Sequence, residues 1–170
     1  MLEVKVDNTQ HAVSEPFDTP DVLKLVHVYV ARGPNVAEGS VKNVICNPNA
    51  EGTIDGDKTF EVKPNPKPIE TWKRWGPSYE IELKVTISKF SGRFIYFGSN
   101  QLHYGVPLVI AEDNRLIITT QCSCGEKITI KTNVLQTNTL YTVIISHKPS
   151  SGDNSMVGRL LKSFVLCEYW

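Results

Sequence analysis

Apolar and polar residues alternate with a period of two along several stretches of the chain. Residues 2–7, 80–87 and 127–131 place Leu, Ile or Val at every second position, with charged residues or Thr between them. This pattern is typical of a strand with one face on a core and the other in water. Denser β-branched and aromatic runs predict strands that the core covers on both sides, at 23–30, 94–97, 116–120 and 140–146.

Turn-forming residues separate these runs. They include Gly-Pro pairs, Asp-Asn and Cys-Gly-Glu, at 33–35, 64–68, 76–77, 113–114, 124–126 and 150–154. Strands that recur about every ten residues and are separated by such turns predict an all-β sandwich or barrel. Residues 156–166 are the one stretch where a helical pattern competes, and they fit a short helix or a last strand equally well.

The length of 170 residues predicts one domain, because it suffices for one buried core but not for two ordinary domains and a linker. Within that domain, residues 49–68 differ in composition, being rich in Gly, Pro and acidic residues. We interpret them as a linker with one embedded strand around residues 59–63. The linker separates a strand-rich piece, 1–48, from a longer one, 69–170.

The net charge of the chain argues against nucleic acid and anionic membranes as partners. The 18 basic and 18 acidic residues cancel, so the chain has no strong field to hold nucleic acid or an anionic membrane surface. No run reaches the roughly 18 apolar residues that a spanning helix needs, so we expect no membrane insertion. The first fifteen residues alternate in polarity and do not form the apolar core of a signal peptide.

Residues 72–147 resemble the front two thirds of a concanavalin A-like, laminin G-like sandwich repeat. The resemblance is carried by WKRWGPSYEIELKV at 72–85, FIYFG at 94–98, YGVPLVI at 104–110, RLII at 115–118 and LYTVII at 140–145. It implies an all-β fold, with two antiparallel sheets in a jelly-roll sandwich. It also implies an extracellular location, for which the export signal would have to lie upstream or have been removed.

The segments of this resemblance occur in an unusual order. Residues 1–13 look like a late strand and turn of the family, and residues 25–44, with VHVY and GSVKNV, look like its closing strand. Either the domain is circularly permuted, or the chain straddles a boundary between tandem repeats. In both cases Leu2–Val6 should pair near the strand at 140–146, although more than a hundred residues separate them.

Candidate ligand residues lie where an aromatic side chain adjoins polar groups. His103 and Tyr104 stand beside Asn100 and Gln101 on a predicted loop, where binding residues tend to be found. Such a set can stack on a sugar ring and fix its hydroxyl groups.

No cofactor is expected, except that the resemblance leaves calcium open. Asp55, Asp57 and Asp153 are candidate oxygen ligands. Their positions in polar segments are equally explained by the preference of Asp for turns.

Catalysis is not expected. Glycosidases of this fold use acids at the first, third and sixth positions of one strand, and here Glu80 and Glu82 are followed by Val85. The two glutamates are better explained as the solvated face of a half-exposed strand. No phosphate loop, dinucleotide motif or Gly-x-Ser-x-Gly sequence occurs.

The four cysteines could form two disulfides, in three connectivities, or none. They are Cys46, Cys122, Cys124 and Cys167. A bond between Cys122 and Cys124 is not expected, because on one strand their side chains would be parallel on the same face. A metal site that joins these two to His103 or His147 is a weaker alternative, because the second Cys pair of a structural zinc site is missing.

The sequence therefore favours a non-catalytic recognition module, whose loops or concave sheet contact a glycan or another extracellular protein. The rival hypothesis is a structural repeat of an adhesive or matrix protein with no small-molecule ligand. A carbohydrate-active hydrolase ranks third.

Overall fold

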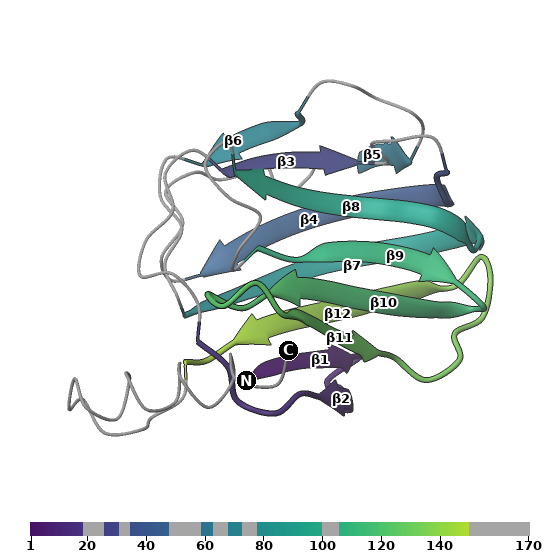
Figure 1. Ribbon diagram of the computed structural model, residues 1–170. Helices are drawn as coiled ribbons and strands as arrows, with labels where there is room; N and C mark the ends of the chain where they lie inside the picture. The colour runs from purple at the N-terminus through teal and green to yellow at the C-terminus, as the bar shows by residue number, and fades with distance from the viewer. Residues whose placement is uncertain are drawn as a thin grey trace, which may run out of the picture.

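The computed structural model describes residues 1–18, 26–30, 35–47, 59–62, 68–72, 78–99 and 106–149. These residues form twelve strands and no helix (Figure 1). The strands are β1 (Leu2–Val6), β2 (Thr9–Val13), β3 (Val26–Val30), β4 (Glu38–Asn47), β5 (Thr59–Val62), β6 (Glu70–Trp72), β7 (Tyr79–Lys89), β8 (Ser91–Ser99), β9 (Leu108–Glu112), β10 (Arg115–Gln121), β11 (Lys127–Lys131) and β12 (Leu140–His147).

The strands make two antiparallel sheets of six strands each, packed as two layers (Figure 1). The first sheet has the order β2-β1-β12-β7-β4-β5, and the second has the order β11-β10-β9-β8-β3-β6. The expected all-β fold with two sheets is confirmed. The strand expected around residues 59–63 is also present, as β5, which pairs with β4 at one edge of the first sheet.

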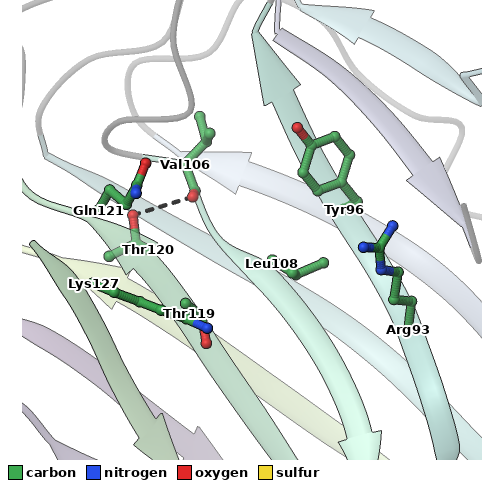
Figure 2. Close-up of a pocket in the computed structure, with 8 residues that line it drawn as sticks. All are labelled: Arg93, Tyr96, Val106, Leu108, Thr119, Thr120, Gln121 and Lys127. Atoms are coloured by element: carbon green, nitrogen blue, oxygen red, sulfur yellow. Dashed lines mark hydrogen bonds between the residues drawn. The ribbon is translucent and has the colours of Figure 1, made fainter. Parts of the chain in front are cut away.

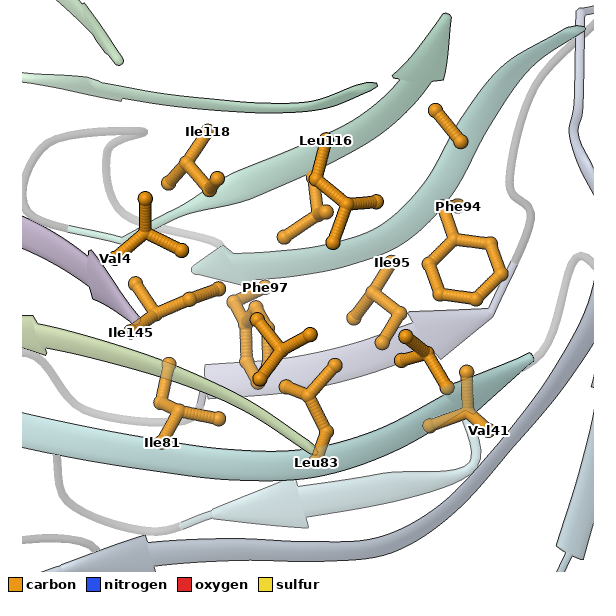
Figure 3. Packing of buried hydrophobic residues seen from close by; sticks show 14 of the residues in the cluster. Val4, Val41, Ile81, Leu83, Phe94, Ile95, Phe97, Leu116, Ile118 and Ile145 are labelled. Carbon is orange, nitrogen blue, oxygen red and sulfur yellow. The ribbon is translucent and has the colours of Figure 1, made fainter. Parts of the chain in front are cut away.

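The period-two pattern of the sequence places the core between the two sheets. In β7 the residues Ile81, Leu83 and Val85 are completely buried, and the residues between them face outward. Phe94 and Leu116 of the second sheet belong to the same hydrophobic cluster (Figure 3). Each such side chain stabilises the fold by about 1.5–3 kcal/mol relative to an exposed one.

The long-range pairing expected from the order of segments is confirmed. β1 and β12 pair antiparallel, with a register that runs from Leu2 opposite His147 to Val6 opposite Val143. Beyond the strand ends, the Met1 ammonium donates to the Lys148 carbonyl oxygen at 2.6 Å, and the Lys148 N–H donates to the Met1 carbonyl oxygen at 3.0 Å. The hydrogen bonding between β1 and β12 therefore extends one residue pair beyond the ends of the two strands.

Two of the hairpins have tight turns of two residues. Asp7 and Asn8 join β1 to β2, and Asp113 and Asn114 join β9 to β10, all four with positive φ. Asn and Asp are the residues that tolerate this conformation, which type I′ hairpins require. The expected turn at 113–114 is thus confirmed. The Asp7 carboxylate also accepts a hydrogen bond of 2.8 Å from the Thr142 N–H, across to β12.

In both sheets, strands from residues 1–48 pair with strands from residues 69–170. In the first sheet, β1 and β4 flank the β12–β7 pair, and in the second sheet β3 pairs with β8. Neither part has a complete sheet of its own. Residues 23–25, which belong to a predicted strand, lie outside the described residues. So do residues 156–166, for which we expected a short helix or a last strand.

Candidate ligand-binding face

The ligand residues predicted from the sequence cannot be placed. Asn100, Gln101, His103 and Tyr104 lie outside the described residues. The three calcium candidates, Asp55, Asp57 and Asp153, lie outside them as well. All seven stay predictions.

A cavity of about 580 Å³ lies at the outer face of the second sheet and reaches the buried residues Val106 and Thr120. Figure 2 shows Arg93 and Tyr96 on one side, Leu108 in the middle, and residues of β10 and β11 on the other side. The full lining among the described residues is Arg93, Tyr96, Val106, Leu108, Thr119, Thr120, Gln121 and Lys127.

A β-bulge places Arg93 and Tyr96 on this one face. In a regular strand, residues three apart point to opposite faces. The register of β8 against β9 shifts between Arg93 and Ile95, so that Arg93 lies opposite Ile110 and Tyr96 lies opposite Leu108. Bulges of this kind re-aim side chains, and they are frequent beside functional sites.

The cavity lies on a row of residues that crosses five strands. Cross-strand register connects them from β3 to β11, and we call Tyr29, Tyr96, Leu108, Thr119 and Thr129 the cross-strand row. Four strand spacings span about 19 Å. Within this row Tyr96, Leu108 and Thr129 are accessible at the surface, whereas Tyr29 and Thr119 are buried, at 9% and 8% exposed.

Aromatic rings occupy one end of the cross-strand row. The ring centroids of Tyr29 and Tyr96 are 5.9 Å apart, and His27 adds a third ring 6.1 Å from Tyr29. Gly98 makes room for this arrangement, because a Cβ atom at that position would collide with the Tyr96 ring. The Tyr96 side chain can thus lean along β8 over the glycine.

Hydroxyl and amide groups occupy the other end. The Thr120 hydroxyl donates to the Val106 carbonyl oxygen at 3.1 Å (Figure 2), and the hydroxyls of Thr119 and Thr129 are 3.3 Å apart. The exposed Thr129 hydroxyl keeps hydrogen-bonding capacity beyond its contact, whereas Thr119 and Thr120 are buried. Arg93 and Lys127 are exposed and add two positive charges, whereas the described lining contains no carboxylate.

The carboxylates considered for catalysis are on the other sheet. Glu80 and Glu82 lie on the outer face of β7, exposed and half-exposed respectively. Val85, at the sixth position, is completely buried in the core. These two glutamates therefore stand on the face of the sandwich opposite the cavity.

The expectation about the cysteines was wrong. Cys122 and Cys124 form a disulfide, with their Cα atoms 5.3 Å apart. The reason is local: β10 ends at Gln121, so the cysteines belong to the turn before β11 and are not held parallel on a strand. The third possible ligand beside them is Glu126, not His147, whose buried ring packs against Phe17 with a centroid distance of 4.7 Å.

The sequence reasoning missed this face, although a signal for it existed. Outward positions of β9 and β10 carry Leu108, Ile110, Ile117 and Thr119, and charges follow only at the next outward pair, Glu112 and Arg115. No family model, curated protein or solved structure matches this chain. The described residues include no helix long and apolar enough to cross a membrane.

Proposed function

We propose that this chain is a non-catalytic, extracellular recognition module of the concanavalin A/laminin G-like jelly-roll kind, which binds a glycan chain across the outer face of the second sheet. The observation that supports this most is the cross-strand row with its cavity. It combines aromatic rings, hydroxyl groups and exposed cations on a rigid sheet.

Each part of the face suits a sugar. The Tyr96 ring offers an apolar surface for the C–H face of a pyranose, while Thr129 and Gln121 can exchange hydrogen bonds with its hydroxyl groups. Arg93 and Lys127 favour a chain that carries carboxylate or sulfate groups, since charge-assisted hydrogen bonds are stronger than neutral ones. Hydrolysis would instead need two carboxyl groups that flank the bond to be cleaved.

The proposal is tested by titrating the full chain against immobilised neutral and acidic polysaccharides. We expect saturable binding, stronger for the acidic chains, and at least a tenfold loss of affinity for Tyr96→Ala, which corresponds to about 1.4 kcal/mol. Glu82→Ala, on the opposite face, is the matched control and should bind like the wild type. A Tyr104→Ala variant tests in the same assay whether the loop predicted from the sequence contributes.

Three outcomes would count against the proposal. Equal binding by Tyr96→Ala and the wild type would place the ligand elsewhere. No measurable binding to any of the polysaccharides would favour the rival hypothesis, a structural repeat of an adhesive or matrix protein. Cleavage of a polysaccharide, abolished by Glu80→Gln, would make the chain a hydrolase.

A further inference from the structure

The disulfide between Cys122 and Cys124 contributes little to holding the fold together. It closes a ring between residues only two positions apart, and such a short ring constrains the unfolded chain far less than a long one does. Backbone hydrogen bonds also hold the turn between β10 and β11, independently of the disulfide. The Cys122 N–H donates to the Glu126 carbonyl oxygen at 2.9 Å, and the Gly125 N–H donates to the Cys122 carbonyl oxygen at 3.0 Å.

The two sulfurs have unequal surroundings. Cys122 is 4% exposed and belongs to the hydrophobic core, whereas Cys124 is exposed on the turn. An attacking thiolate must approach the sulfur that it attacks, so access favours attack at Cys124.

The surroundings also suit Cys122 as the leaving group. Its sulfur accepts a hydrogen bond of 3.2 Å from the Glu126 N–H. A donor aimed at the sulfur stabilises the thiolate that forms when the bond breaks, and this offsets part of the cost of forming a thiolate at a buried sulfur.

One nearby charge selects among thiols. A carboxylate oxygen of Glu126 lies within 4.8 Å of both sulfurs. This negative charge repels anionic reagents and opposes the thiolate state. The turn should therefore react faster with uncharged thiols than with negatively charged ones.

We propose that the Cys122–Cys124 disulfide is a thiol–disulfide exchange site for external thiols, with uncharged dithiols as its preferred reaction partners. One thiolate of the dithiol attacks the Cys124 sulfur, the S–S bond breaks, and Cys122 leaves as a thiolate. The second thiol of the reagent then attacks the mixed disulfide and releases Cys124. Two electrons and two protons pass from the dithiol to the protein, and the reagent leaves as a disulfide.

The first experiment treats the folded full chain with dithiothreitol in native buffer. Mass spectrometry with peptide mapping follows the peptide that contains Cys122 and Cys124 separately from Cys46 and Cys167. We expect this peptide to gain two hydrogens while the near-ultraviolet circular dichroism of the folded chain persists. Reduction that occurs only in urea, or that abolishes the folded spectrum, would overturn the proposal.

Single variants test the direction of attack. With Cys122→Ser, the remaining Cys124 thiol should form a mixed disulfide with 2-hydroxyethyl disulfide at least about tenfold faster than Cys122 does in Cys124→Ser, because exposure controls access. Equal rates, or faster reaction of Cys122, would overturn the assigned direction.

Glu126→Gln keeps both cysteines and the N–H donor, and it tests the charge. At low salt, this variant should be reduced several-fold faster than the wild type by an anionic thiol such as mercaptoethanesulfonate, with a smaller gain for dithiothreitol. A slower reaction with the anionic thiol would contradict the selection by charge.

Discussion

The two outer faces of the sandwich are built from the same alternating pattern but differ in chemistry. The face of the first sheet carries charges of both signs, among them Glu3, Lys5, Lys42, Glu82 and Lys84. The face of the second sheet carries the cross-strand row, with neighbouring Ile110 and Ile117 also pointing outward. These residues of the second sheet are partly covered and lie next to one another, whereas the apolar residues on the first face, such as Ile45, stand among charges. The difference is the reason for proposing that the ligand binds the second face rather than the first.

The apolar residues of the second face also raise the risk of unwanted association. Apolar groups on an outer face favour association with other molecules in general, and charged residues are the usual protection. The second sheet keeps only a few such charges around the cavity, including Arg93 and Lys127. The first sheet also exposes apolar side chains, Ile45 at 45% and Leu140 at 53%, but they lie among charges of both signs.

The largest expected effect comes from the core that both faces share. Leu116 is completely buried between the sheets, so Leu116→Ala should lower the free energy of unfolding by about 2–5 kcal/mol. Urea denaturation, followed by far-ultraviolet circular dichroism, measures the change. The two sheets should lose structure in one transition. Separate transitions for the two sheets would contradict a common core.

The next effect concerns the first sheet. Gly39 has a φ of 156° at a bulge of β4, and a Cβ atom there would collide with the Thr86 carbonyl oxygen of β7. Gly39→Ala should therefore destabilise the domain by about 2–3 kcal/mol. Ser40→Ala, at the next position, is the control and should change stability by less than about 0.5 kcal/mol. Equal thermal midpoints for the two variants would argue against the bulge.

A smaller effect sharpens the assignment of the second face. Gly98→Val pushes the Tyr96 ring off β8, so we expect about fivefold weaker glycan binding, or about 1 kcal/mol, with a smaller change in stability. The double variant with Tyr96→Ala should bind no more weakly than Tyr96→Ala alone, because the two changes act on one ring. Additive losses would show that Gly98 acts by another route.

The smallest effect is expected on the charged face. Lys5 and Glu3 form an ion pair of 3.7 Å, and the Lys5 side chain is 41% exposed. Exposed pairs contribute little, so Lys5→Ala should change the free energy of unfolding by at most about 0.5 kcal/mol and leave glycan binding unchanged. A loss of binding in this variant would remove the distinction between the two faces.

Local pattern sufficed for eight of the strands and for the turn at Asp113 and Asn114, but it did not predict β2, β4, β6 or β9. It did not suffice for the partner of β1, since alternation says which side of a strand is buried but not which strand lies next to it. That pairing came from the order of the family-like segments. The cavity was missed because the bulge between Arg93 and Ile95 changes which side chains share a face. The disulfide was missed because β10 ends one residue before Cys122.

The pairing of β1 with β12 also matters while the protein is being made. Asp7 and Thr142, which are joined by a hydrogen bond, are 135 residues apart. At ribosomal rates of about 5–20 residues per second, the first strand waits on the order of 10 s for its partner. During that time the apolar side chains of Leu2, Val4 and Val6 have no sheet to cover them. A site for chaperones on the nascent polypeptide is therefore expected at β1.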